Sequence, residues 1–109
     1  NPLNLSKEKV VIYNEKDDVI YTTNEENIIA PTKAQLQNIR QKKEWRYTYN
    51  EYEIIAIHYE SKNTHIIVFA AAVDIYGINK LNNLPINYTS QFKELISKNS
   101  KLGLEQKLK

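Results

Sequence analysis

The strongest constraint on the fold is a run of eight apolar residues at 66–73, which follows two other strand-like segments at close spacing. Residues 45–50 alternate aromatic and polar side chains, and residues 52–59 are rich in β-branched and aromatic ones, so both segments favour strands. Turns of a few residues separate the three segments, and turns this short join antiparallel neighbours. Because residues 66–73 are apolar on both faces of a strand, we expect the sheet to be covered on both sides.

An aromatic face of this sheet is the first candidate binding site. If Tyr49 faces Tyr52 across the tight turn, Trp45 lies opposite Ala56. The aromatic face then carries five residues that could line a small-molecule pocket between the sheet and the helices: Trp45, Tyr47, Tyr49, Tyr52 and His58. Tyrosine suits such a pocket because its ring stacks and its hydroxyl orients a ligand. The alternative is that cross-strand aromatic pairs only stabilise the sheet.

Further candidate sites lie toward the end of the last strand. Asp74 opens the sequence Asp-Ile-Tyr-Gly, which suits a type I turn, and its carboxylate could also stand at a pocket mouth. The alanines at 70–72 leave room for a ligand or, as we expect, for a closely packed helix.

The two histidines form a further candidate. If residues 61–62 make a two-residue turn, His58 lies opposite His65 with Glu60 nearby, and two imidazoles with a carboxylate could hold zinc. A register change of one residue removes this pairing. We therefore expect a structural histidine pair and assign no metal site and no cofactor.

The N-terminal part predicts a hairpin followed by helical structure. Residues 10–13 and 19–23 are β-branched and aromatic segments on either side of a polar turn, which indicates two paired strands. Ile28 and Ile29 suggest a short helical turn. Thr32 and Gln35 match a capping box, which predicts a helix at about residues 32–43.

The chain after residue 77 predicts further helical structure. Leucine and isoleucine at spacing three suggest a helix start at 78–84, and residues from Thr89 onward look helical again. The order of elements therefore predicts an α+β fold. Its centre is a five-stranded antiparallel sheet, with helices between the second and third strands and a C-terminal helical segment, which is the order of a PAS-like domain.

Composition excludes several function classes. The 109 residues carry 15 Lys and Arg against 13 Asp and Glu, a net charge of +2 that is too small to favour nucleic-acid binding. The longest apolar run is far shorter than the roughly 20 residues that span a bilayer. Without cysteine the chain has no thiolate nucleophile, and two glycines cannot make a glycine-rich phosphate loop. No catalytic constellation is evident.

Two segments resemble a known family. The hairpin at 10–23 resembles the opening hairpin of the extracytoplasmic sensor region of bacterial two-component histidine kinases, and residues 72–84 (A-V-D-I-Y-G followed by leucines) resemble the segment that ends it. The resemblance covers about residues 5–84. It implies a PAS-like, non-catalytic sensor on the periplasmic face of the inner membrane, acting as a homodimer. It also implies an unidentified small-molecule or envelope signal, and a cytoplasmic kinase core in the same polypeptide that holds the phosphorylated histidine and the ATP site.

The domain boundaries follow from this resemblance. We expect the sensor domain at residues 1–88 and a C-terminal helix and tail at 89–109. Sequences of the family enter a membrane helix soon after Leu84, whereas residues 85–109 are polar here and end in a segment (Glu-Gln-Lys-Leu) that resembles the start of an epitope tag. The chain lacks methionine, so we expect a fragment of a longer protein. The alternative is a free-standing α+β binding, inhibitor or immunity-type protein; a small hydrolase is a distant third.

Overall fold

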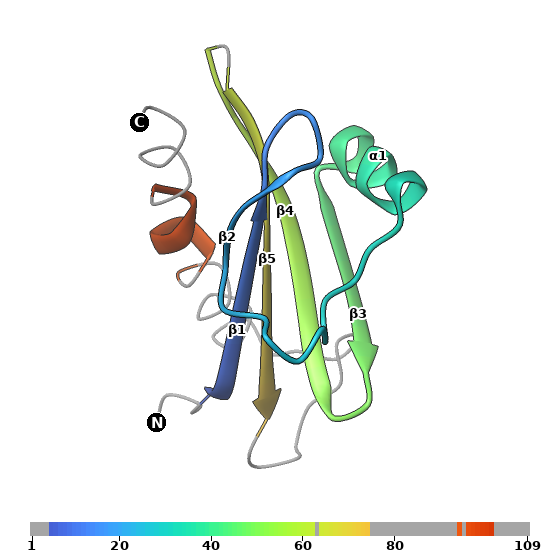
Figure 1. Ribbon diagram of the computed structural model, residues 1–109, viewed down its shortest axis with the longest axis vertical. Coiled ribbons are helices and arrows are strands. Elements are labelled where there is room, and N and C mark those ends of the chain that lie inside the picture. The colour runs from blue at the N-terminus through green and yellow to red at the C-terminus, as the bar shows by residue number, and fades with distance from the viewer. Residues whose placement is uncertain (1–4, 63, 75–93, 95, 102–109) are drawn as a thin grey trace.

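A computed structural model describes residues 5–62, 64–74, 94 and 96–101 of the chain. One helix and five strands are defined: β1 (Leu5–Tyr13), β2 (Val19–Thr22), α1 (Lys33–Lys42), β3 (Glu44–Tyr49), β4 (Tyr52–Ser61) and β5 (Thr64–Asp74). The strands form one antiparallel sheet in the order β2-β1-β5-β4-β3, with β2 and β3 at its edges (Figure 1). The expected α+β class and five-stranded antiparallel sheet are confirmed.

The register of the β3–β4 hairpin agrees with the prediction from its aromatic pattern. Tyr49 pairs with Tyr52 and Trp45 with Ala56. The two-residue connection at 50–51 fixes this register, because a shift by one residue would move every apolar side chain to the opposite face. The aromatic residues of β3 therefore lie on the face that α1 covers.

Both faces of the sheet carry a hydrophobic core, as the apolar character of β5 predicts. The face under α1 gathers the buried residues Val11, Tyr13, Ile29, Leu36, Ile39, Tyr52, Ile54, Ala56, Ile67, Phe69 and Ala71. The opposite face gathers Val10, Ile12, Ile55, Ile66, Val68, Ala70, Ala72 and Ile96. Ile96 belongs to the helical residues 94 and 96–101, so Ala70 and Ala72 share a core cluster with a helical residue, as expected of small side chains.

The helix α1 begins and ends with defined caps. The backbone N–H of Gln35 donates to the Thr32 hydroxyl at 3.1 Å, and the backbone N–H of Thr32 donates to the side-chain oxygen of Gln35 at 2.8 Å. These two bonds confirm the capping box. At the other end Lys43 adopts a left-handed conformation (φ 75°) and its N–H donates to the Ile39 carbonyl. Arg40 ties this end of α1 to the β1–β2 turn through Asp17 Oδ1, at 2.7 Å.

Two expectations about the first half of the chain were wrong. Only α1 lies between β2 and β3, since residues 23–31 contain no helical turn where Ile28 and Ile29 suggested one. The Asn24 side chain instead bonds the backbone of both isoleucines and builds an irregular loop. In addition, β1 begins at Leu5 rather than at residue 10, because pairing with β5 extends it through a polar segment.

Several predictions fall on residues outside the described ranges. These are the turn at 74–77, the helix start at 78–84, the domain boundary at 88, and the start of the C-terminal helix. Within that last segment, residues 94 and 96–101 are helical as predicted. Among the described residues, no helix has the length and apolar character needed to cross a membrane.

Candidate functional site

A groove of about 330 Å³ lies between the edge strand β3 and the segment that leads into α1. Its lining comes from both sides and comprises Asn27, Ile28, Ala30, Pro31, Gln35, Trp45, Tyr47 and Tyr49. The groove therefore opens on the α1 face of the sheet, where the aromatic pattern predicted a pocket.

One wall of the groove is the aromatic side of β3. The strand alternates, so Trp45, Tyr47 and Tyr49 project to the same side. The Trp45 and Tyr47 rings stack with centroids 4.1 Å apart and planes 23° from parallel. Tyr49, the last residue of β3, is 48% exposed. The wall thus offers flat apolar surface with hydroxyl groups along it.

The opposite wall is the loop that Asn24 organises. Its carboxamide oxygen accepts hydrogen bonds from the N–H groups of Ile28 at 2.8 Å and Ile29 at 3.3 Å, and its nitrogen donates to the Ile29 carbonyl at 2.8 Å. Ile29 is thereby buried in the core, while Asn27 and Ile28 line the groove. Sequence reasoning missed this wall; the available signal was an asparagine positioned to bond the backbone beyond it.

The groove is uncharged. Its lining combines amide, apolar and aromatic side chains without any acid or base. Burial, reinforced by the nearby Tyr13, raises the pKa of Tyr47 from 10.0 to about 12, which extends the neutral form of its phenol further into the alkaline range. Such a surface suits an uncharged amphipathic molecule with a planar apolar part, because a charged ligand would be desolvated here without an opposite charge.

The other residues predicted for this site lie elsewhere. Tyr52 is 6% exposed and belongs to the core cluster under α1. His58 lies near the opposite end of α1, where its backbone N–H donates to the backbone carbonyl of Lys43 at 2.9 Å. Asp74 ends β5, and its side chain is outside the described part of the structure. The structure therefore brings Trp45, Tyr47 and Tyr49 together in the groove lining. Tyr52 lies across from Tyr49 on the same face but is buried in the core, and His58 does not line the groove.

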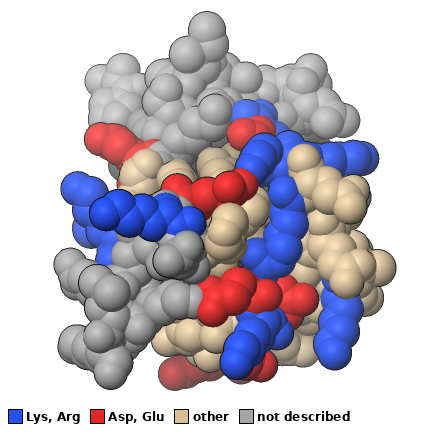
Figure 2. Space-filling model, turned by 90° about the horizontal axis from the view of Figure 1, so that it is seen from above, with Lys and Arg blue, Asp and Glu red and all other residues tan. Residues whose placement is uncertain are grey.

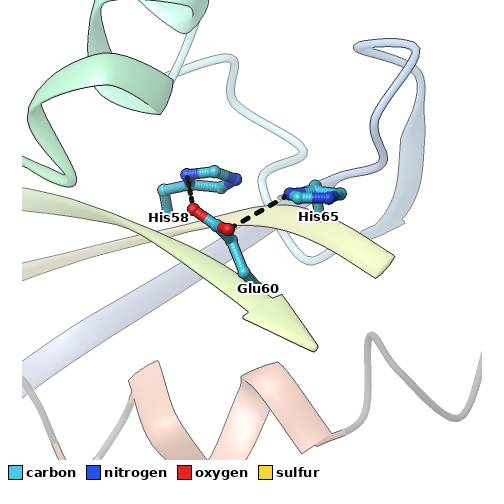
Figure 3. A group of neighbouring side chains, drawn as sticks. All are labelled: His58, Glu60 and His65. Atoms are coloured by element: carbon cyan, nitrogen blue, oxygen red, sulfur yellow. Dashed lines mark ion pairs between the residues drawn. The ribbon is translucent and has the colours of Figure 1, made fainter. Parts of the chain in front are cut away.

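His58 belongs to a second group, at the end of the β4–β5 hairpin. The condition for pairing His58 with His65, a turn at residues 61–62, is not met: Ser61 pairs with Thr64, which places Glu60 opposite His65. This register differs from the expected one by two residues, so the side chains keep their faces. Figure 3 shows the Glu60 carboxylate lying between the imidazoles of His58 and His65, whose centroids are 5.7 Å apart.

Charge on the described surface is mixed where it can be seen. Figure 2 shows Lys and Arg side chains interspersed with Asp and Glu on the face viewed from above. A polyanion is attracted by a patch of positive charge. On that face, the described residues form no patch of a single sign.

The two groups of side chains, the uncharged groove and the His58–Glu60–His65 cluster, are the candidate sites of the described chain. They differ in what they could bind. The groove offers volume for a small molecule, and the cluster offers nitrogen and oxygen atoms that could coordinate an ion. No family model, curated protein or solved structure matches this chain.

Proposed function

We propose that this chain is the extracytoplasmic, PAS-like sensor domain of a membrane-bound bacterial two-component sensor histidine kinase. In this proposal the domain is itself non-catalytic, stands on the periplasmic face of the inner membrane and works as a homodimer. It responds to a small-molecule or envelope signal and passes the response to a kinase core in the same polypeptide.

The observation that carries the proposal is the groove between β3 and the segment entering α1. A PAS-like sensor is expected to bind its ligand between the sheet and its helices. The groove of about 330 Å³, between the edge strand β3 and the segment that leads into α1, supports such a role. The sheet order supports the same fold, because the N-terminal hairpin joins the last three strands through the pairing of β1 with β5.

A ligand in this groove would act by shifting a population. It would contact β3 on one side and the entry to α1 on the other, and so favour one spacing between them. The helix packs on the centre of the sheet through Leu36 and Ile39, so a change in its position reaches β4 and β5. The strand β5 then leads into the segment after Asp74, through which the signal would leave the domain.

Trp45 provides a direct test, because it is the single tryptophan of the chain and it lines the groove. A panel of uncharged amphipathic small molecules should include at least one that changes the Trp45 fluorescence in a saturable way. Tyr47→Leu removes the ring and hydroxyl beside Trp45 and should weaken that response at least tenfold. Thr48→Ala, on the opposite face of β3, is the matched control and should leave it unchanged.

The outcome that contradicts the groove as a ligand site is the absence of any saturable response, or an equal loss in both variants. The membrane topology needs a separate test, the parent reading frame on both sides of this chain. Apolar helices of about 20 residues on both sides and a kinase core downstream would support the sensor. Nearby start and stop codons without such helices would favour the free-standing binding, inhibitor or immunity-type protein instead.

A further inference from the structure

The side chains of His58, Glu60 and His65 converge at the end of the β4–β5 hairpin. His58 and Glu60 are two residues apart in β4 and so share a face, and His65 lies directly across from Glu60 in β5. One ligand atom of each residue lies within 4.8 Å of the other two. The three come from two strands whose mutual position the sheet fixes, so the convergence is part of the fold.

The ligand atoms, up to 4.8 Å apart, are spaced somewhat more widely than in a formed zinc centre. The Nδ1 atom of His58 lies 3.6 Å from Glu60 Oε1, and the Nδ1 atom of His65 lies 3.8 Å from Glu60 Oε2. Ligand atoms bound to one zinc ion stand roughly 3.3 Å apart in a tetrahedron. Small rotations of exposed side chains close the difference, since Glu60 is 43% and His65 is 41% exposed.

A second observation, independent of the clustering, points to a ligand. The His58 side chain is only 5% exposed, and among the described residues neither of its ring nitrogens has a hydrogen-bond partner. Buried polar atoms in folded proteins almost always have a partner, which can be an ion or a water molecule. An ion bound between His58 and Glu60 would supply that partner.

The protonation states suit metal binding. Burial, followed by the charge of Lys43, lowers the pKa of His58, a direction that favours the neutral imidazole required of a metal ligand. The hydrogen bond from Lys43 lowers the pKa of Glu60, which stays ionised. Two imidazole rings and one carboxylate match the preference of zinc for nitrogen ligands with an oxygen donor.

We infer that His58, Glu60 and His65 form a binding site for a divalent transition metal, zinc by ligand preference, with a water molecule completing the coordination. The Lys43 ammonium, which pairs with Glu60, competes with the ion for the carboxylate. It can move into solvent, because its side chain is 59% exposed. The bound ion would join β4 to β5 beside the C-terminal end of α1. This inference is independent of the proposed sensor function.

The test is calorimetric titration of the chain, prepared without a polyhistidine tag, with Zn²⁺ alone as the probe. We expect one ion per chain and a rise in the thermal unfolding temperature when Zn²⁺ is present. His65→Ala and Glu60→Gln should each weaken binding at least tenfold. Both residues are substantially exposed, so these variants should keep the wild-type circular dichroism spectrum in the presence of a chelator.

Two further variants make the result specific. Lys43→Gln removes the competing cation and should tighten Zn²⁺ binding, the opposite direction from the ligand variants. Glu51→Gln, in the β3–β4 turn, removes an exposed carboxylate elsewhere and should leave the affinity unchanged. The inference is overturned if the wild-type chain binds no zinc, or if binding persists undiminished in the double variant His65→Ala/Glu60→Gln.

Discussion

The two ends of α1 face different surroundings on the same side of the sheet. At its N-terminal end Gln35 borders an uncharged groove, where aromatic rings leave open space. At its C-terminal end Lys43 meets the His58–Glu60–His65 cluster, where a buried imidazole has no hydrogen-bond partner within the described part of the chain. The difference shows that free volume and unsatisfied polar atoms are separate signs of binding: the first fits an organic molecule, and the second fits an ion.

A deletion in the hydrophobic core under α1 should have the largest effect on stability. Phe69 is fully buried in β5 and packs edge-to-face on Tyr13, with ring centroids 5.7 Å apart. Phe69→Ala should lower the free energy of unfolding by about 3–5 kcal/mol, because it deletes a buried ring and leaves a cavity. Urea unfolding followed by circular dichroism measures this. Tyr49→Ala, at a side chain 48% exposed, should cost far less, and equal losses would contradict this account of the core.

Alkaline pH should act on the groove end through Tyr47. Its folded pKa of about 12 lies above the ordinary 10.0 because burial disfavours the phenolate. The resulting stabilisation is fully present below pH 10 and is lost as the pH rises toward 12. We expect a loss on the order of 1–2 kcal/mol, allowing for partial solvent contact. Tyr47→Phe should flatten the dependence of the urea midpoint on pH over this range, and a curve as steep as that of the wild type would refute the assignment.

The smallest expected effect on stability comes from the N-cap of α1. The same change should affect binding at the groove but not at the histidine cluster. Thr32→Ala removes the N-cap of α1 and should cost about 1 kcal/mol of stability. Because the cap lies next to the groove and far along the helix from Lys43, the ligand response of Trp45 should weaken while Zn²⁺ affinity stays constant. Thr32→Ser keeps the hydroxyl and is the matched control for both titrations. A parallel loss of both binding activities would show that the two ends are coupled.

The groove wall on β3 could be predicted from the sequence because one short strand contains it. Alternation within β3 places its aromatic residues on one side, and the two-residue turn before Tyr52 fixes the register against β4. The facing wall could not be predicted in the same way. It depends on three hydrogen bonds between the Asn24 side chain and the backbone, one donated and two accepted by that side chain. An irregular loop of this kind has no periodic pattern in the sequence.

The geometry of the histidine cluster could be predicted only in part. Ser61, Lys62 and Asn63 all suit a turn, so the sequence does not choose between neighbouring two-residue loops. A slip of two residues leaves every side chain on its own face, so the hydrophobic pattern cannot distinguish the alternatives either. The common face of His58, Glu60 and His65 was therefore predictable, whereas the position of Glu60 directly across from His65 was not.

The pairing of β1 with β5 has a consequence for how the sheet assembles. Among the described strands, β1 comes first in the chain and completes its hydrogen bonds only by pairing with β5, which comes last. Contacts between such distant segments form slowly because a long loop must close first. Until then β1 has an open edge that other chains could add to. Residues 7–9 of β1 are all charged, and charges on an unpaired edge oppose such association. The polar segment that obscured the start of β1 in the sequence is thus suited to protect the edge of β1 until it pairs with β5.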